Sequence, residues 1–291
     1  MLGEIRGEVR FKEPLSFHTS LRIGGPADIF VVPQDVEDIR HALMFAEREQ
    51  LPVAVVGGGN NLVVRDRGIR GVVLKLEGCL GRAEYYGEEA LAGAGVGLSA
   101  LIREAAALNL GGIECLVGIP ATIGGALAMN AGTADGWIGD FVSAVYYLHP
   151  DGALGEFKPS GEFGYRAFHL PAGAVLIGCR LQLHRRPLPE IQKEIRARLK
   201  QKKATQPLAL ASAGFVWKNP AGELASRLIE KAGLRGKRVN GAEISSKHAN
   251  FIVNRGAAGA ADILGLMELT RERVHSHFGI TLETEIRILG E

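Results

Sequence analysis

The placement of glycine constrains this chain more than any other feature of its sequence. A glycine turn separates two apolar runs, residues 51–56 and Leu62–Val64, which read as strands. The turn consists of Gly57, Gly58, Gly59, Asn60 and Asn61. Because glycine adopts positive φ angles without a Cβ clash, such a turn lets backbone N–H groups approach an anion. It is therefore a candidate phosphate-binding turn, and a structural turn between strands is the alternative.

Neither common phosphate-binding fingerprint fits the chain. A P-loop needs Gly-Lys-Ser/Thr after the turn, where this sequence has Asn61-Leu62. A dinucleotide-binding fingerprint needs a third glycine and a following helix. Residues 93–98 precede a helical pattern, but Leu98 stands where the third glycine should be. Both the P-loop and the Rossmann interpretations therefore fail.

A second glycine-rich block extends from Gly118 to Gly132 and is small and nearly uncharged. Pro120 fixes one φ angle, and the pair Gly124-Gly125 removes side-chain bulk. This composition suits a backbone surface for a flat aromatic cofactor and its diphosphate. A tight hairpin in a glycine-rich domain is the alternative interpretation.

Charge and hydropathy exclude two classes of protein. The formal net charge of +2 argues against a nucleic-acid-binding protein, which would carry a strong basic excess. The first eight residues include charges where a signal peptide needs an apolar core, and no apolar run is long enough to span a bilayer. We expect a cytoplasmic protein that binds neither nucleic acid nor membrane.

The cysteines and histidines do not indicate a metal site. Cys79, Cys115 and Cys179 are widely spaced and odd in number, which favours reduced thiols over a disulfide framework. His275 and His277 form the only close histidine pair and have no Cys or acidic partner at ligand spacing. We therefore expect no bound metal.

The periodicity of apolar residues predicts a mixed α+β chain. Strands are expected at residues 28–32, 174–184 and 281–289, and helices near residues 98–110, 224–232 and 260–278. Asp35 is placed to cap a helix whose apolar face contains Ile39 and Leu43. Another helix follows the Pro-rich boundary at residues 185–189 and has Ile191 and Ile195 on one stripe.

Several motifs together resemble the MurB family of flavoenzymes, the UDP-N-acetylenolpyruvoylglucosamine reductases of peptidoglycan synthesis. They occur in the family's order and extend nearly from end to end of the chain. The segments are residues 19–28 (TSLRIGGPAD), 57–61 (GGGNN), 118–132 (GIPATIGGALAMNAG), 164–166 (GYR), 218–220 (KNP), 245–251 (SSKHANF) and 282–287 (LETEIR).

The resemblance implies a fold and a domain division. The expected fold is α+β, with a two-part FAD-binding domain of the PCMH type and a smaller α/β substrate-binding domain. The first FAD-binding subdomain would span residues 1–75, the second residues 76–186, and the C-terminal domain residues 187–291. The FAD-binding residues would be Gly57, Gly58, Gly59, Asn60, Asn61, Gly118, Ile119, Pro120, Thr122, Gly124 and Gly125.

The reaction that the resemblance implies has two halves. NADPH reduces FAD, and the reduced flavin then delivers hydride to C3 of an enolpyruvyl ether on a UDP-linked amino sugar. Negative charge develops at C2 and on the adjacent carboxylate, so the site needs cations or hydrogen-bond donors there. Arg166 matches the family's catalytic arginine, and its planar fork suits a carboxylate. Glu285 matches the family's catalytic glutamate, which would act protonated or through a held water, with a pKa raised by burial.

Three residues are expected to bind the anionic substrate: Lys203, Lys218 and Asn219. Asn219 matches a substrate-contacting position of the family. Lys203 also belongs to an ordinary solvated run with Lys200 and Lys202, so its role stays open. Tyr165 has two interpretations, stacking on a ring or packing in the core, and we expect the protein to be a monomer.

Phe215 departs from the family pattern. The residue after Gly214 is a serine or cysteine in the family and is taken as the proton donor to C2, whereas phenylalanine cannot donate a proton. Trp217 would add bulk on the same side if this segment is a strand.

Three hypotheses follow from this departure. The chain is a working reductase in which a water or another group protonates C2, or a divergent FAD-binding paralogue with lost or altered substrate activity. A scaffold without cofactor is the third, and the intact glycine segments argue against it. Because so much else matches, we favour the reductase.

Overall fold

The computed structural model describes residues 2–76, 78 and 80–291, so Cys79 lies outside the described residues. The chain forms two compact units. Unit 1 comprises Met1–Phe11, Ile29–Gly58 and Gly71–Lys202. Unit 2 comprises Lys12–Asp28, Gly59–Arg70 and Lys203–Glu291.

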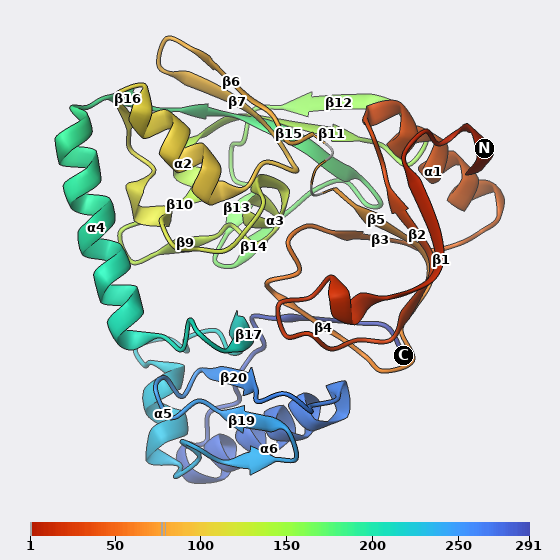
Figure 1. The fold of residues 1–291 in the computed structure, drawn as a ribbon. Coiled ribbons are helices and arrows are strands. Elements are labelled where there is room, and N and C mark those ends of the chain that lie inside the picture. Colours follow the sequence, from red (N-terminus) through yellow and green to blue (C-terminus); the bar gives the residue numbers. More distant parts are fainter. Residues whose placement is uncertain (1, 77, 79) are drawn as a thin grey trace. The chain divides into compact units, whose positions relative to one another are not determined.

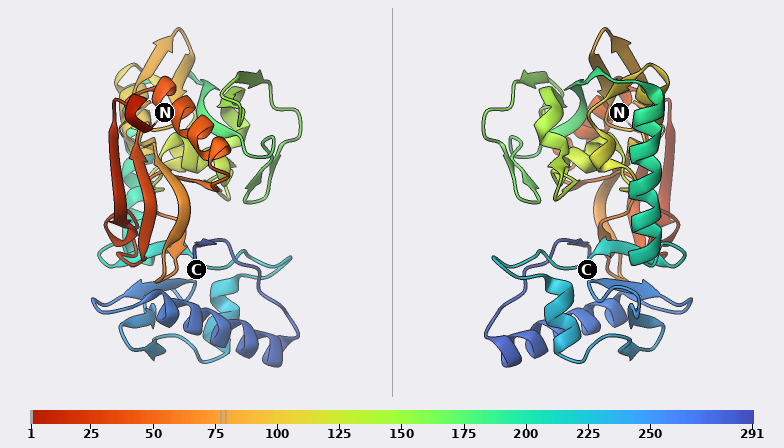
Figure 2. Two further views of the ribbon diagram at one scale, coloured as in Figure 1. Left: turned by 90° about the vertical axis from the view of Figure 1, so that its right-hand side faces the viewer. Right: turned by 90° about the vertical axis from the view of Figure 1, so that its left-hand side faces the viewer.

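A four-stranded sheet has the strand order β1 (Glu8–Pro14), β2 (Pro26–Val32), β5 (Ile69–Lys75) and β3 (Val53–Val56), the last two parallel. Helix α1 (Val36–Arg48) packs in unit 1 (Figure 2). Asp35 caps its N-terminus, and the Asp35 carboxylate accepts hydrogen bonds from the amides of Glu37 and Asp38. The predicted cap is confirmed. The buried helix face and its partners on β2 and β5 are Ile39, Ala42, Leu43, Ala46, Val31, Val72 and Leu74.

A five-stranded antiparallel sheet forms the second core of unit 1 (Figure 1). Its order is β12 (Leu154–Phe157), β11 (Val142–Leu148), β15 (Val175–Gln182), β7 (Glu89–Gly93) and β6 (Ala83–Tyr86). Helices α2 (Leu98–Ala107) and α3 (Ile123–Ala128) bury their apolar residues in the same cluster as β7, β11 and β15.

Helix α2 is shorter than predicted. It ends at Ala107, because Asn109 adopts a positive φ of 57° and the chain then forms strand β8 (Leu110–Gly111). β8 pairs with β16 (His184–Arg185). The predicted strand at 174–184 is accordingly divided into β15 and β16.

Short elements complete unit 1. Strands β9 (Gly132–Thr133) and β10 (Gly136–Trp137) pair antiparallel, as do β13 (Phe163–Gly164) and β14 (Ala167–Phe168). Short 3-10 helices span Leu2–Glu4, Glu114–Leu116 and Ile138–Phe141. Helix α4 (Leu188–Thr205) follows β16 and belongs to unit 1 as far as Lys202.

Unit 2 contains a four-stranded antiparallel sheet and two helices. The strand order is β17 (Ala211–Phe215), β20 (Phe251–Asn254), β19 (Ala242–Ile244) and β18 (Arg238–Val239). Helices α5 (Ala225–Lys231) and α6 (Ala260–Phe278) share one apolar cluster with this sheet (Figure 1). The carboxylate of Asp66 accepts hydrogen bonds from the amides of Ala260 and Ala261, which open α6. A 3-10 helix spans Leu15–Phe17.

The predicted terminal strand at 281–289 is only partly correct. Strand β21 comprises Arg287–Leu289 alone and pairs in parallel with β4 (Leu62–Val64). The preceding residues bond instead to the segment after β17: the Lys218 amide donates to Glu283 O, and the Glu285 amide donates to Val216 O. These two bonds flank a single antiparallel bridge between Trp217 and Thr284, which does not extend into a ladder.

The mixture of helices and sheets confirms the α+β class. The three-part division at residues 75 and 186 stays a prediction. Among the described residues, no helix has both the length and the apolar character needed to cross a membrane.

Candidate active site

The two glycine segments predicted from the sequence meet within unit 1. A Cβ added to Gly57 would lie 2.5 Å from Thr122 Oγ1, so only glycine allows this approach. Lys75, which is buried, donates from Nζ to Gly57 O at 2.7 Å. The structure thus joins the end of β3 to the second glycine block, and Lys75 was missed by the sequence interpretation.

The second glycine block leads from a turn into α3. Gly118 has a φ of +73°, which favours glycine. Thr122 caps α3, its hydroxyl accepting a hydrogen bond from the Gly125 amide at 3.2 Å. A Cβ added to Gly124 would lie 3.0 Å from the Ala94 side chain. Gly124 has no side chain, and its backbone therefore packs closely against Ala94.

These features fit a bound FAD. Gly57 adjoins Thr122 of the Gly118–Gly125 block, which contains three glycines and no charged residue. Such a composition lets main-chain groups approach a diphosphate and a flat ring system. Which residues contact the cofactor stays a prediction.

Gly58 also belongs to unit 1, whereas Gly59, Asn60 and Asn61 of the first glycine turn belong to unit 2. Gly59 has a φ of +66°, and a Cβ there would lie 2.0 Å from His18 O. Asn61 Nδ2 donates to Glu285 O at 3.2 Å, and the Arg287 amide donates to Asn61 O at 2.9 Å. The turn therefore holds the segment that contains the predicted catalytic glutamate.

Arg166 occupies the tip of the β13–β14 hairpin. It has a φ of +55°, which costs a non-glycine residue about 1 kcal/mol. Its Nη1 donates to Gly132 O at 3.3 Å, and its guanidinium carbon lies 5.0 Å from the centre of the Trp137 ring. Tyr165 is exposed and meets Trp137 edge-on at 5.5 Å, so its core interpretation is wrong.

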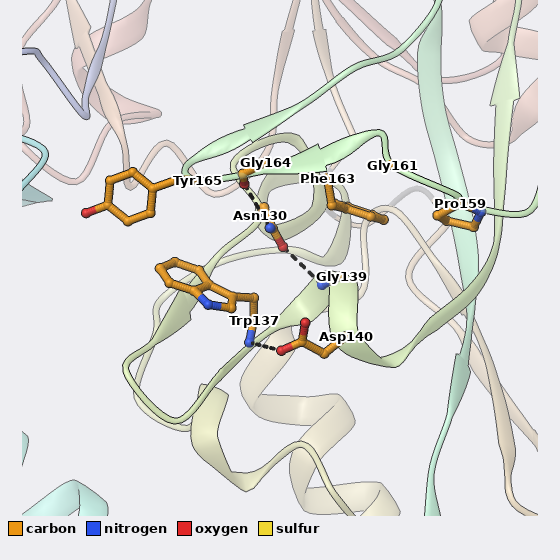
Figure 3. A pocket seen from close by; sticks show the side chains of 9 residues that line it. All are labelled: Asn130, Trp137, Gly139, Asp140, Pro159, Gly161, Phe163, Gly164 and Tyr165. Atoms are coloured by element: carbon orange, nitrogen blue, oxygen red, sulfur yellow. Dashed lines mark hydrogen bonds between the residues drawn. The ribbon is translucent and has the colours of Figure 1, made fainter. Parts of the chain in front are cut away.

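Asn130 fixes the base of this hairpin. Its Nδ2 donates to Gly164 O at 2.9 Å and its Oδ1 accepts from the Gly139 amide at 3.0 Å (Figure 3). The surrounding pocket has a volume of about 430 Å³, within the usual range for small-molecule sites. Its lining includes Asn130, Trp137, Asp140, Phe163, Gly164 and Tyr165.

Phe215 ends β17 in unit 2, opposite Phe251. Its ring stacks on His248 at 5.0 Å with an interplanar angle of 19° and meets Phe251 edge-on at 5.2 Å. Burial, as the largest cause, lowers the pKa of His248. The expected donor position is therefore filled by an aromatic cluster, and the sequence interpretation assigned His248 no role.

Trp217 does not share the side of Phe215. The strand ends at Phe215, and Trp217 is buried in the core of unit 2. The Asn250 side chain holds it by accepting from the Trp217 amide and donating to its carbonyl. The prediction that Trp217 adds bulk on the same side as Phe215 is therefore wrong.

Glu285 lies next to the Phe215 strand, because its amide bonds Val216 O at 2.8 Å. It is half-buried, whereas Glu283 is exposed. Lys218 Nζ lies 3.3 Å from Glu283 Oε2. The structure thus brings Glu285 and Phe215 together in unit 2, and Arg166 belongs to unit 1.

The other predicted substrate residues have structural contacts as well. Asn219 Oδ1 accepts from the Ala225 amide at the start of α5, and Lys203 O accepts from Lys247 Nζ. Lys203 is exposed, whereas its neighbour Lys202 is half-buried. Substrate contact by Lys203, Lys218 and Asn219 stays a prediction.

Among the residues that the structure describes, no cluster of His, Cys, Asp or Glu is arranged to hold a metal. Cys115 and Cys179 are buried free thiols. Burial raises the pKa of Cys115 to about 11.

Comparison with known proteins identifies both parts of the chain. Residues 27–157 match the FAD binding domain family, and residues 206–289 match the UDP-N-acetylenolpyruvoylglucosamine reductase C-terminal domain. The chain is 43% identical over 289 residues to the UDP-N-acetylenolpyruvoylglucosamine reductase of Geobacter metallireducens, covering 99% of this chain and 96% of that protein. It is 46% identical over 290 residues to the reductase of an Anaeromyxobacter species, covering 99% and 90%.

Solved structures agree. The UDP-N-acetylenolpyruvylglucosamine reductase of Thermus caldophilus superposes with a TM-score of 0.83 at 38% identity, covering 98% of this chain and all of that one. The 6-hydroxy-D-nicotine oxidase of Arthrobacter nicotinovorans, with a TM-score of 0.50 at 18% identity, shares the fold alone. The cofactors of this family are FAD and NADPH. The chain belongs to the UDP-N-acetylenolpyruvoylglucosamine reductase family.

Proposed function

We propose that this protein reduces the enolpyruvyl ether of UDP-N-acetylglucosamine to UDP-N-acetylmuramate, a step in peptidoglycan precursor synthesis. Bound FAD supplies the redox chemistry, passing hydride from NADPH to C3 of the substrate. We propose further that the protein acts in the cytoplasm as a monomer.

The conformation of Arg166 is the observation that carries this proposal. A hairpin tip at positive φ favours glycine, yet the chain keeps arginine there and supports it with Trp137 and Gly132 O. Strain of this kind is concentrated at functional sites. The guanidinium binds the substrate carboxylate and stabilises the charge that develops on it during hydride addition.

Within unit 2, the proposed substrate-binding residues are Glu285, Lys203, Lys218 and Asn219. The half-buried Glu285 carboxyl assists protonation, directly or through a water. The lysines bind the diphosphate as point charges, and the Asn219 amide contributes a hydrogen bond.

Phe215 supports a second candidate function. Its ring offers no proton at the expected donor position, so a divergent flavoprotein with altered substrate activity is the alternative. The two candidates share the reduction of FAD by NADPH and differ only in the fate of the reduced flavin.

Stopped-flow absorbance under anaerobic conditions tests the proposal. NADPH should bleach the flavin band, and UDP-N-acetylglucosamine enolpyruvate should restore it, with the product gaining two hydrogens by mass spectrometry. If NADPH bleaches the flavin but neither the wild type nor Phe215→Ser consumes the substrate, the divergent flavoprotein replaces the reductase. A colourless protein that takes up no added FAD would leave only the scaffold hypothesis.

A further inference from the structure

Lys202, near the end of α4, lies against the Gly118 turn. A Cβ added to Gly118 would be 3.0 Å from Lys202 Cδ and 3.7 Å from its Nζ. The Leu199 side chain flanks the same glycine at 3.2 Å. The lysine stem therefore covers the first residue of the block that we assign to FAD.

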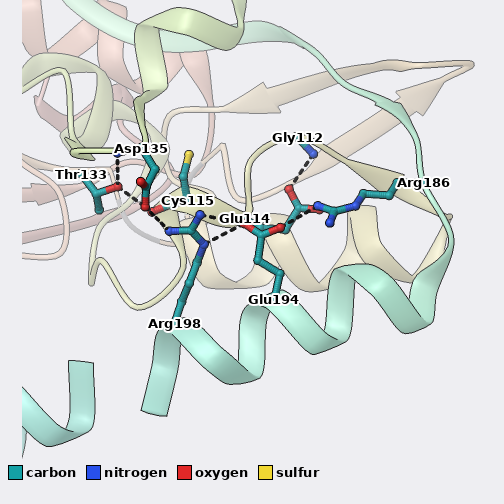
Figure 4. A network of polar contacts seen from close by, with 8 residues as sticks. All are labelled: Gly112, Glu114, Cys115, Thr133, Asp135, Arg186, Glu194 and Arg198. Carbon is teal, nitrogen blue, oxygen red and sulfur yellow. Dashed lines mark hydrogen bonds and ion pairs between the residues drawn. The ribbon is translucent and has the colours of Figure 1, made fainter. Parts of the chain in front are cut away.

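A network of ion pairs fixes α4 in this position (Figure 4). Arg186 bonds the buried Glu114 at 3.1 Å and Glu194 at 2.7 Å. Arg198 bonds Glu194 at 2.8 Å and Asp135 at 2.6 Å. Arg186, just before α4, and Arg198, within it, are thus neutralised by carboxylates.

Lys202 lies one turn beyond Arg198 on the same helix face, but it does not take part in this network of ion pairs. Among the described residues it makes no hydrogen bond and no ion pair. Burial, followed by repulsion from Arg198, lowers its pKa to about 8, and Arg166 acts in the same direction. Cys115 is no counter-ion at neutral pH, because burial raises the pKa of its thiol to about 11.

A half-buried ammonium without a counter-ion is costly unless a ligand supplies negative charge. Two features identify that ligand. The Lys202 stem lies on the block that we assign to FAD, and its ammonium has no carboxylate partner among the described residues.

We propose that the Lys202 ammonium lies beside the ring system of bound FAD and stabilises the negative charge that the ring gains on reduction. The inference rests on the FAD assignment in the proposed function. A cation near the ring raises the flavin reduction potential, so Lys202 makes the flavin a better acceptor of hydride from NADPH.

The test is the flavin midpoint potential, measured anaerobically against a reference dye without substrate. In Lys202→Met, the ratio of reduced to oxidised flavin at a fixed potential should fall about tenfold, which is about 30 mV for a two-electron couple. Lys202→Arg should stay near the wild type because it keeps the charge. Lys200→Met, which removes an exposed lysine from the same helix, is the matched control and should change nothing.

The pH dependence gives a second readout. Arg198, Arg166 and Cys115 are the charged or titratable groups that act on Lys202. The difference in potential between the wild type and Lys202→Met should vanish at high pH, once Lys202 loses its proton, whereas Lys202→Arg should keep the wild-type potential. The bound flavin stabilises the ammonium, so this loss should occur above the pKa of about 8 that Lys202 has without a ligand.

Three outcomes would overturn the proposal. An unchanged potential in Lys202→Met with a raised KM for the enolpyruvyl substrate assigns Lys202 to the substrate. Equal loss of affinity for oxidised and reduced FAD assigns it to the diphosphate or to the fold. If Lys200→Met shifts the flavin midpoint potential as much as Lys202→Met does, the effect comes from the overall charge of the helix and not from the position of Lys202. Because the midpoint potentials and the FAD affinities are measured without substrate, they test the proposal whether or not the protein turns over the enolpyruvyl ether.

Discussion

Replacing Phe215 with serine should weaken the fold while increasing substrate turnover. The Phe215 ring makes two aromatic contacts, a stack on His248 and an edge contact with Phe251. Each such pair contributes about 0.5–1.5 kcal/mol beyond area burial, so the loss of two pairs alone should lower the free energy of unfolding of Phe215→Ser by at least about 1–3 kcal/mol. Urea denaturation of the FAD-loaded protein measures this loss.

The expected gain in rate comes from general-acid help to C2. A positioned proton donor typically contributes about 10²- to 10⁴-fold, which corresponds to about 3–5 kcal/mol of barrier. The reoxidation of reduced flavin by UDP-N-acetylglucosamine enolpyruvate should therefore accelerate at least about a hundredfold. Reduction of the flavin by NADPH precedes this step and should be unaffected.

Two further variants separate space from acidity. Phe215→Cys should behave like serine, whereas Phe215→Ala removes the same aromatic contacts but supplies no proton. Equal acceleration in all three variants would show that the ring only blocked the substrate. If the wild type already turns over at an ordinary enzyme rate and all three changes slow it, another donor is in use and our reasoning about Phe215 is refuted.

Three other predictions concern the hairpin, the glycine turn and a buried carboxylate. Arg166→Lys should slow flavin reoxidation by the substrate at least about tenfold more than it slows NADPH oxidation, because lysine lacks the planar fork; equal slowing in stopped-flow traces would make Arg166 structural. Gly57→Ala should weaken FAD binding at least about tenfold in fluorescence titrations, since its Cβ would meet a neighbour at 2.5 Å, whereas Gly97→Ala, whose Cβ has open space to 4.0 Å, should not. Arg255, as the largest cause, lowers the pKa of buried Glu243 below its ordinary 4.5. Glu243→Gln should therefore lower the free energy of unfolding at pH 7 by about 2 kcal/mol. The difference from wild type should shrink as pH falls below 4.5, and a difference constant with pH would contradict this.

Local sequence patterns predicted the elements whose causes are local. The cap at Asp35 and the long helices α4 and α6 follow from short-range chemistry and from periodic apolar residues. The predicted bounds of helices and strands were wrong where segments far apart in the sequence form hydrogen bonds with each other. Helix α2 ends early because the chain after Asn109 pairs with residues 184–185, and the terminal strand is short because residues 283–285 bond the loop after Phe215.

The sequence by itself determined the family, the cofactor and the α+β class, because the motifs that identify them are short contiguous segments in the family's order. Only the tertiary structure showed that Gly57 meets Thr122 and that Phe215 stacks on His248. It also separated Lys202 from Lys203, which are adjacent and chemically identical in the sequence. Burial and the positions of neighbouring charges distinguish the two lysines, and both depend on contacts between residues far apart in the chain.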